Sequence, residues 1–113
     1  RSITTDKMLT EKPDLVKRFL TASQNAFKWA QQNPEEACKL HVERVPEVAL
    51  DDCLGSVKAT LAFVFNEHSA KTGLGLYDPE RLGFTWNVVA EAQQLDKSWD
   101  PKLAIDVSDV PTN

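Results

Sequence analysis

Hydrophobic and polar positions alternate along this chain with the period of an α-helix. Over residues 13–32, apolar side chains recur at alternating intervals of four and three residues, which places them on one helical face: Leu15, Phe19, Ala22, Ala26 and Trp29. Related spacing predicts further helices over 34–45, 50–68 and 79–94. We therefore predict a mainly α segment of about four helices.

Residues that favour helix ends support these boundaries. Pro13 suits a first helical turn, where its missing N–H is not needed, and Asp14 complements the positive end of the helix dipole. Asn33 is predicted to end the first helix and to cap the second by accepting from the amide of Glu36. Pro46 is predicted to stop that second helix.

The segments outside these helices are short. Residues 2–5 are β-prone, so the end of a strand is an alternative there, and residues 6–9 fit a single turn. Residues 71–77 form a predicted loop, a last turn begins at residues 100–101, and the tail 106–113 is predicted to be extended. No repeat or flexible linker interrupts the pattern, so residues 1–113 are interpreted as one helical segment.

Composition excludes several classes of protein. The 113 residues carry a net charge of −4 and form no basic stripe, which argues against nucleic-acid binding. The longest apolar run, residues 61–65, is too short to span a bilayer. The chain begins without Met or a signal-peptide pattern, which we interpret as a cloning boundary, a processed end or an interior cut.

The two cysteines, Cys38 and Cys53, each fall in the first turn of a predicted helix. If the two helices run antiparallel, these positions lie at opposite ends of the pair, whereas bridged cysteines need Cα atoms within about 7 Å. We therefore predict two unpaired, buried thiols. A disulfide, which would fit an oxidising compartment, is the alternative.

Residues with catalytic or ligand-binding chemistry form no recognised motif. His41 and His68 show neither His-x-x-x-His nor Glu-x-x-His spacing, so no metal site is predicted. The glycines of residues 72–76 lack the Gly-Lys-Ser/Thr of a phosphate loop and suit a connection with positive φ. We predict no catalytic residue and no cofactor.

The three tryptophans are candidates for stacking on a ligand ring. Trp29 and Trp86 fall on predicted core faces, so packing is the favoured interpretation for both. Trp99 lies in a loop, where packing is only modestly favoured over a ligand contact.

Several of these segments together resemble the C-terminal portion of periplasmic solute-binding proteins of ABC importers. The branch is the one for nitrate, sulfonate, taurine and thiamine-precursor uptake. The resemblance rests on the order and spacing of residues 4–8, 12–19, 32–37 and 75–81, and on the ending 111–113. Lys12 departs from the pattern, because a capping residue usually stands there.

This resemblance implies the helical C-terminal segment of a two-lobed α/β, type 2 periplasmic binding protein, and a non-enzymatic role. Such a protein captures a small organic ion or heterocycle in the periplasm and delivers it to an ABC permease in the membrane. Most cleft residues of these proteins lie upstream, so no ligand-binding residue is assigned here. A thiamine-pyrimidine synthase-like enzyme and a stand-alone helical interaction module are the alternatives. In isolation, an exposed apolar face is expected to favour a homodimer or a swapped assembly.

Overall fold

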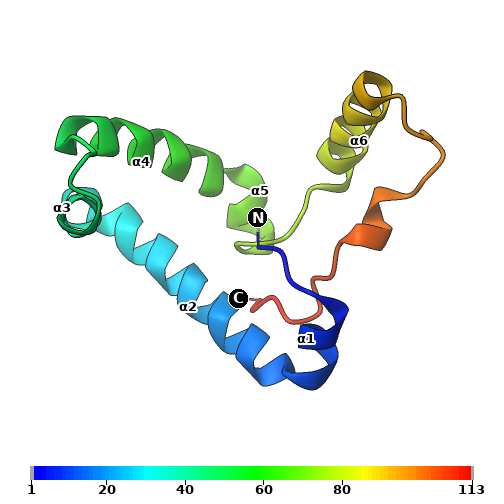
Figure 1. Cartoon of the computed structure of the whole chain (residues 1–113), viewed down its shortest axis with the longest axis horizontal. Coiled ribbons are helices and arrows are strands. Elements are labelled where there is room, and N and C mark those ends of the chain that lie inside the picture. Colours follow the sequence, from blue (N-terminus) through cyan, green and yellow to red (C-terminus); the bar gives the residue numbers. More distant parts are fainter. Residues whose placement is uncertain (1, 113) are drawn as a thin grey trace.

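The computed structural model describes residues 2–112, which fold into helices joined by short connections (Figure 1). Six α-helices are followed by one 3₁₀ turn: α1 Asp6–Glu11, α2 Pro13–Gln32, α3 Pro34–Arg44, α4 Leu50–Val64, α5 Glu67–Thr72, α6 Pro79–Gln93 and η1 Pro101–Ala104. The predicted mainly α class is confirmed. The alternative of a strand at residues 2–5 is wrong, since no strand occurs between residues 2 and 112.

The predicted helix over residues 50–68 is in fact two helices. Asn66 accepts a hydrogen bond at Oδ1 from the Ser69 amide (3.0 Å), and the Ser69 hydroxyl accepts from the Asn66 amide (2.9 Å). This reciprocal cap starts α5, because it satisfies amides that a continuing α4 would have bonded internally. His68 consequently lies in the first turn of α5 and not near a helix C-terminus.

Asn33 joins α2 to α3 differently from the prediction. Its side chain makes no capping bond to the amides of α3, and its Nδ2 donates instead to the Trp29 carbonyl of α2, at 3.0 Å. The Trp29 carbonyl also accepts the Asn33 backbone N–H (2.9 Å), so Asn33 closes the end of α2 with two bonds, while Pro34 opens α3 without a side-chain cap.

The helices form an open arrangement. Figure 1 shows α2 and α4 diverging from α3, with α6 and η1 set apart from this pair. The radius of gyration is 16.7 Å, compared with about 13 Å for a compact chain of this length. Among the described residues, the buried hydrophobic side chains are Cys38, Cys53, Leu74 and Ala90. Little apolar surface is therefore enclosed.

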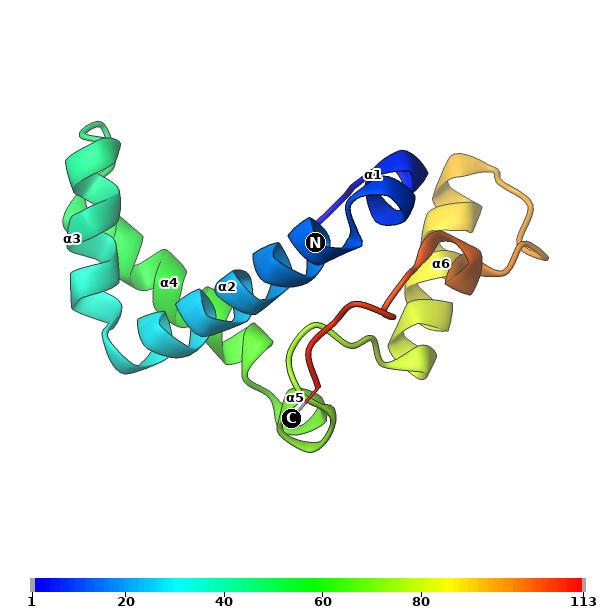
Figure 2. The same cartoon turned by 90° about the horizontal axis from the view of Figure 1, so that it is seen from below.

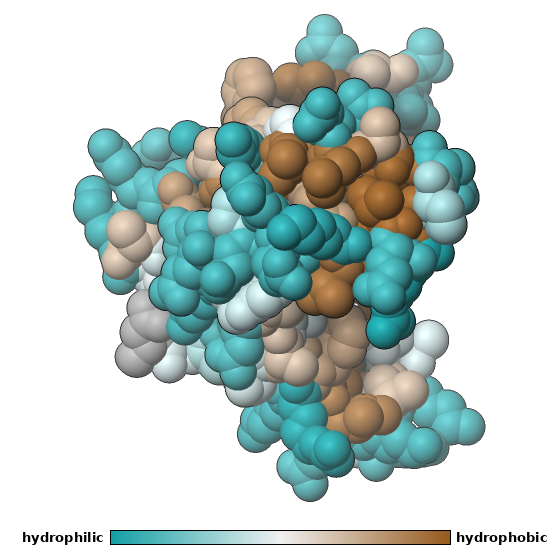
Figure 3. Space-filling view, turned by 90° about the vertical axis from the view of Figure 1, so that its left-hand side faces the viewer, coloured by the Kyte–Doolittle hydropathy of each residue, from teal (hydrophilic) through white to brown (hydrophobic). Residues whose placement is uncertain are grey.

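The predicted core face of α2 is largely uncovered. Leu15 is 48% exposed, Phe19 57% and Trp29 42%, although α1, α3, the loop at Leu74 and the C-terminal tail lie against other parts of this long helix. Figure 3 shows hydrophobic residues reaching the surface on the side of the molecule that bears α3. The prediction of a core face was wrong, since all five of its residues are exposed and the half-buried positions of α2 form a neighbouring stripe: Val16, Leu20, Ser23, Gln24 and Ala30. No helix among residues 2–112 is long and apolar enough to cross a membrane.

The cysteine prediction is wrong in its main point. Cys38 and Cys53 form a disulfide, with Cα atoms 5.7 Å apart, although both side chains are buried as expected. The prediction assumed antiparallel helices, whereas α3 is seen nearly end-on in Figure 1 while α4 runs across the view. This steep crossing brings an early turn of α4 against the middle of α3.

Candidate functional site

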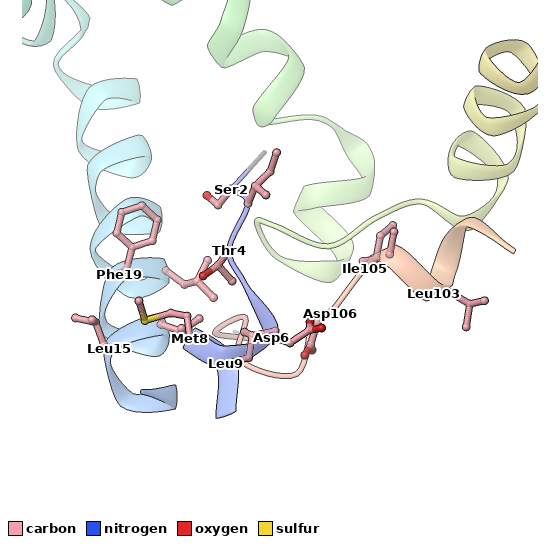
Figure 4. A pocket seen from close by; sticks show the side chains of 14 residues that line it. Ser2, Thr4, Asp6, Met8, Leu9, Leu15, Phe19, Leu103, Ile105 and Asp106 are labelled. Atoms are coloured by element: carbon pink, nitrogen blue, oxygen red, sulfur yellow. The ribbon is translucent and has the colours of Figure 1, made fainter. Parts of the chain in front are cut away.

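A large cavity lies between the N-terminal segment and residues 103–106, at the N-terminal end of α2 (Figure 4). It has a volume of about 820 Å³ and is open to solvent. Its walls come from residues 2–9, from the first two turns of α2 and from residues 103–106. Segments from opposite ends of the sequence therefore build one concave surface.

Local hydrogen bonds fix the N-terminal wall. Thr5 caps α1 by accepting the Met8 amide at Oγ1 (3.2 Å), and the Lys12 amide donates to the Met8 carbonyl (3.0 Å) where α1 turns into α2. This turn packs α1 against α2 and places Met8 and Leu9 in the cavity wall. Met and Leu side chains offer an adaptable apolar surface to a ring or an alkyl group.

The C-terminal wall is held in place by contacts of the tail. Gln24 of α2 donates through Nε2 to the Leu74 carbonyl (2.8 Å) and to the Pro111 carbonyl (2.9 Å). Lys17 pairs with Asp109 at 3.6 Å. The Val110 N–H donates to the Val107 carbonyl (3.1 Å) and closes a turn. The tail, which was predicted to be extended, is therefore bent. The tail is therefore fastened along α2 at two points.

The glycine-rich loop supports the same region. Gly73 and Gly75 have φ values of 94° and 92°, which confirms the predicted need for positive φ. A Cβ at Gly75 would stand 3.1 Å from Cγ1 of Val110. The backbone of the loop thus packs closely against the Val110 side chain of the tail.

Two carboxylates supply the charge of the cavity. Asp6 lies in the first turn of α1, and Asp106 follows η1. The Ser108 hydroxyl (2.6 Å) and then the Ser108 amide (2.8 Å) donate to Asp106 Oδ1, and these bonds hold the pKa of Asp106 below its ordinary value. In Figure 4 both carboxylates appear at the same edge of the cavity.

The histidines and the remaining hollows are separate from this cavity. His41 lines a second hollow of about 490 Å³ between α2, α3 and α4, together with Asp52. His68 lines a third, of about 220 Å³, beside Tyr77 and the start of α6. The structure does not bring the two histidines together, and no group of three or more His, Cys, Asp or Glu side chains in residues 2–112 has metal-binding geometry.

The three tryptophans do not all pack as predicted. Trp86 and Trp99 pack against each other, with ring centroids 5.0 Å apart, so the packing interpretation is confirmed for both, although Trp99 is still 41% exposed. Trp29 is 42% exposed and belongs to no enclosed core. None of the three lines the large cavity.

Sequence reasoning assigned no ligand-binding residue, and it missed Asp6 and Asp106. A local signal existed for the second carboxylate, because Asp-x-Ser is typical of a turn in which the Asp side chain accepts from the residue two positions later. The spatial meeting of residues 2–9 with residues 103–106 had no such signal, since it depends on tertiary packing.

Comparisons with known proteins support the resemblance. Residues 2–37 match the family described as NMT1/THI5 like, which confirms the resemblance to the NMT1-type periplasmic solute-binding proteins. The chain is also similar to the riboflavin-binding protein RibY of Chloroflexus aurantiacus, with 28% identity over 109 residues. That alignment covers 94% of this chain and 31% of the relative, so the chain spans about a third of the relative's length. No solved structure matches significantly.

Proposed function

We propose that this chain is the helical C-terminal part of a solute-binding protein of an ABC importer. The protein captures a small organic ion or heterocycle and passes it to a permease in the membrane, without catalysing a reaction. The observation that carries this proposal is the similarity to a riboflavin-binding protein, because it extends over 94% of the chain and not only over one motif. Residues 2–37 agree independently.

The large cavity is the proposed contribution of this chain to solute binding. It is concave, mostly apolar and edged by a few polar side chains, which is the usual character of small-molecule sites. Its volume of about 820 Å³ is sufficient for a heterocycle. Riboflavin, which the relative's name specifies, is therefore the first solute to test, beside nitrate, taurine, alkanesulfonates and thiamine precursors.

The periplasm is the proposed location. Solute-binding proteins of this family are typically extracytoplasmic. The Cys38–Cys53 disulfide supports the same location, because disulfides persist in oxidising compartments and are rare in the cytosol.

Thermal unfolding of the chain with each solute tests the proposal. A solute that binds only the folded state at 100 times its Kd adds about 2.7 kcal/mol to the free energy of unfolding, so the expected result is a rise in Tm for one member of the panel. No rise with any solute would contradict solute binding by this chain.

A pair of variants locates the binding site. Ile3 lines the cavity yet is 94% exposed, and Phe63 lies on α4 away from it and is 80% exposed. Ile3→Ala is expected to weaken binding by about 3- to 10-fold through lost apolar contact, whereas Phe63→Ala is expected to leave affinity unchanged. Equal effects of the two variants would place the solute elsewhere.

A further inference from the structure

The charge of the large cavity has a single sign. Asp6 and Asp106 are its ionisable side chains, and none of the described residues that line it is Lys, Arg or His. Ser2 and Thr4 add hydroxyl groups, and the remaining lining is mainly apolar. Within residues 2–112, the side chains that line the cavity therefore offer a bound solute apolar walls and carboxylates, and none of them is a cation.

No ion pair within residues 2–112 neutralises the carboxylate of Asp6 or Asp106. The ion pairs between residues 2 and 112 involve neither Asp6 nor Asp106. Lys17, whose neighbour Val16 lines the cavity, pairs with Asp109 on the tail. Both carboxylates are thus available to a bound group.

Hydrogen bonding favours the ionised form of Asp106. Asp6 lies in the first turn of α1 and, within residues 2–112, makes no such bond to a serine. Asp106 accepts two hydrogen bonds at Oδ1 from Ser108, and such bonds favour the charged state of a carboxyl group.

These charges decide which solutes fit. An organic anion would lose hydration on entering the cavity and would then be repelled by two negative groups. A solute with a positive nitrogen would be attracted by the same groups, while its ring replaced water against Met8, Leu9 and Leu20.

Building on the proposed function, we infer that this cavity selects solutes with an apolar or aromatic body that carries an ammonium or amidinium group. Small organic anions such as sulfonates are excluded by the same charges. Within the range of solutes that the family resemblance implies, the inference favours amine-bearing heterocycles.

A matched pair of probes tests this inference. Tryptamine and indole-3-acetate share an indole ring and differ in the sign of the side-chain charge at pH 7. Isothermal titration of the 113-residue chain is expected to give about tenfold or tighter binding of tryptamine, corresponding to about 1.4 kcal/mol. The preference should shrink as salt is raised, because these carboxylates are near the surface.

Variants assign the preference to the cavity. The double variant Asp6→Asn, Asp106→Asn removes both charges, and an Asn side-chain oxygen can still accept from Ser108. It is expected to reduce the preference to about threefold or less. Asp96→Asn is the matched control, since Asp96 makes the same turn with Ser98 (2.9 and 2.7 Å) and does not line the cavity.

The outcomes separate this inference from the proposed function. Equal affinity for the two probes, tighter binding of indole-3-acetate, failure of both probes to bind, or an unchanged preference in the double variant would each overturn the inference. If sulfonate or nitrate raises Tm while tryptamine does not, solute binding stands and the inference fails. If no member of the solute panel binds, the proposed function fails.

Discussion

The two ends of α2 differ in how they are held. At the C-terminal end, α3 and α4 cross and are joined covalently through Cys38 and Cys53, both buried. Towards the N-terminal end, beside the large cavity, the tail is held on α2 by two hydrogen bonds of Gln24, at the middle of the helix, and by the ion pair of Lys17 with the partly buried Asp109. The comparison shows that stability is concentrated away from the candidate site, whose walls depend on a small number of polar contacts.

Removing the disulfide should have the largest effect on stability. Cys38→Ser with Cys53→Ser frees a loop with a sequence separation of 15, which is expected to lower the free energy of unfolding by about 3 kcal/mol. Urea unfolding measures the change. Dithiothreitol should destabilise the natural chain by a similar amount and leave the double variant unaffected. Insensitivity of the natural chain to the reductant would show that α3 and α4 do not depend on the bridge.

Gln24→Ala should have the next largest effect and should act at the middle of α2, where the tail is held. It leaves the carbonyls of Leu74 and Pro111 without their shared donor in a partly buried position, at an expected cost of about 2 kcal/mol. Faster amide exchange in residues 105–112 is the expected local signature.

Gln31→Ala is the control for Gln24→Ala, because Gln31 lies on the same helix and is exposed. Its stability should change by less than about 0.5 kcal/mol. Equal effects of the two variants would mean that Gln24 does not fasten the tail.

Much of the helical structure could be predicted from the sequence. Pro13, Pro34 and Pro79 each begin a helix as expected, because the missing N–H and the fixed φ of proline act locally. Asp78 caps α6 by accepting the amides of Glu80 and Arg81 at Oδ1. Such signals need only a few adjacent residues, so no tertiary information was required.

What could not be predicted depends on how helices meet. The spacing of Cys38 and Cys53 is compatible with a free pair or with a bridge, and the crossing of α3 and α4 decides between them. The apolar stripe of α2 is real, yet its exposure depends on which segments cover it. The expectation of a homodimer or swapped assembly, and the division into one segment over residues 1–113, stay predictions that light scattering and limited proteolysis can examine.

The break between α4 and α5 was missed although its signal is local. Replacing Asn66 by Ala removes the side-chain oxygen that caps α5 and is expected to cost about 1 kcal/mol. Amide exchange should become faster in residues 67–72 and stay unchanged in α3. Asn25→Ala, on an exposed position inside α2, is the control and should leave stability nearly unchanged. Unaltered exchange in α5 would show that Asn66 does not start this helix.

The prediction with the smallest expected effect concerns two Asp-x-Ser turns, one at the cavity and one away from it. Asp106 and Asp96 each have a pKa held below the ordinary value by a serine hydroxyl and then by that serine's amide. Ser108→Ala and Ser98→Ala should each raise the pKa of the paired carboxyl, because the hydroxyl stabilises the charged form. Because the pKa of each carboxyl is lowered in the folded state, each carboxylate adds to the free energy of unfolding at pH values above the ordinary Asp pKa of about 3.9. This contribution is lost as pH falls through the lowered pKa. NMR titration of the side-chain carboxyl carbons measures both shifts, and an unchanged pKa of Asp106 in Ser108→Ala would mean that the hydroxyl does not stabilise this carboxylate. Since only Asp106 lines the cavity, tryptamine binding near pH 4 should weaken in Ser108→Ala and stay the same in Ser98→Ala.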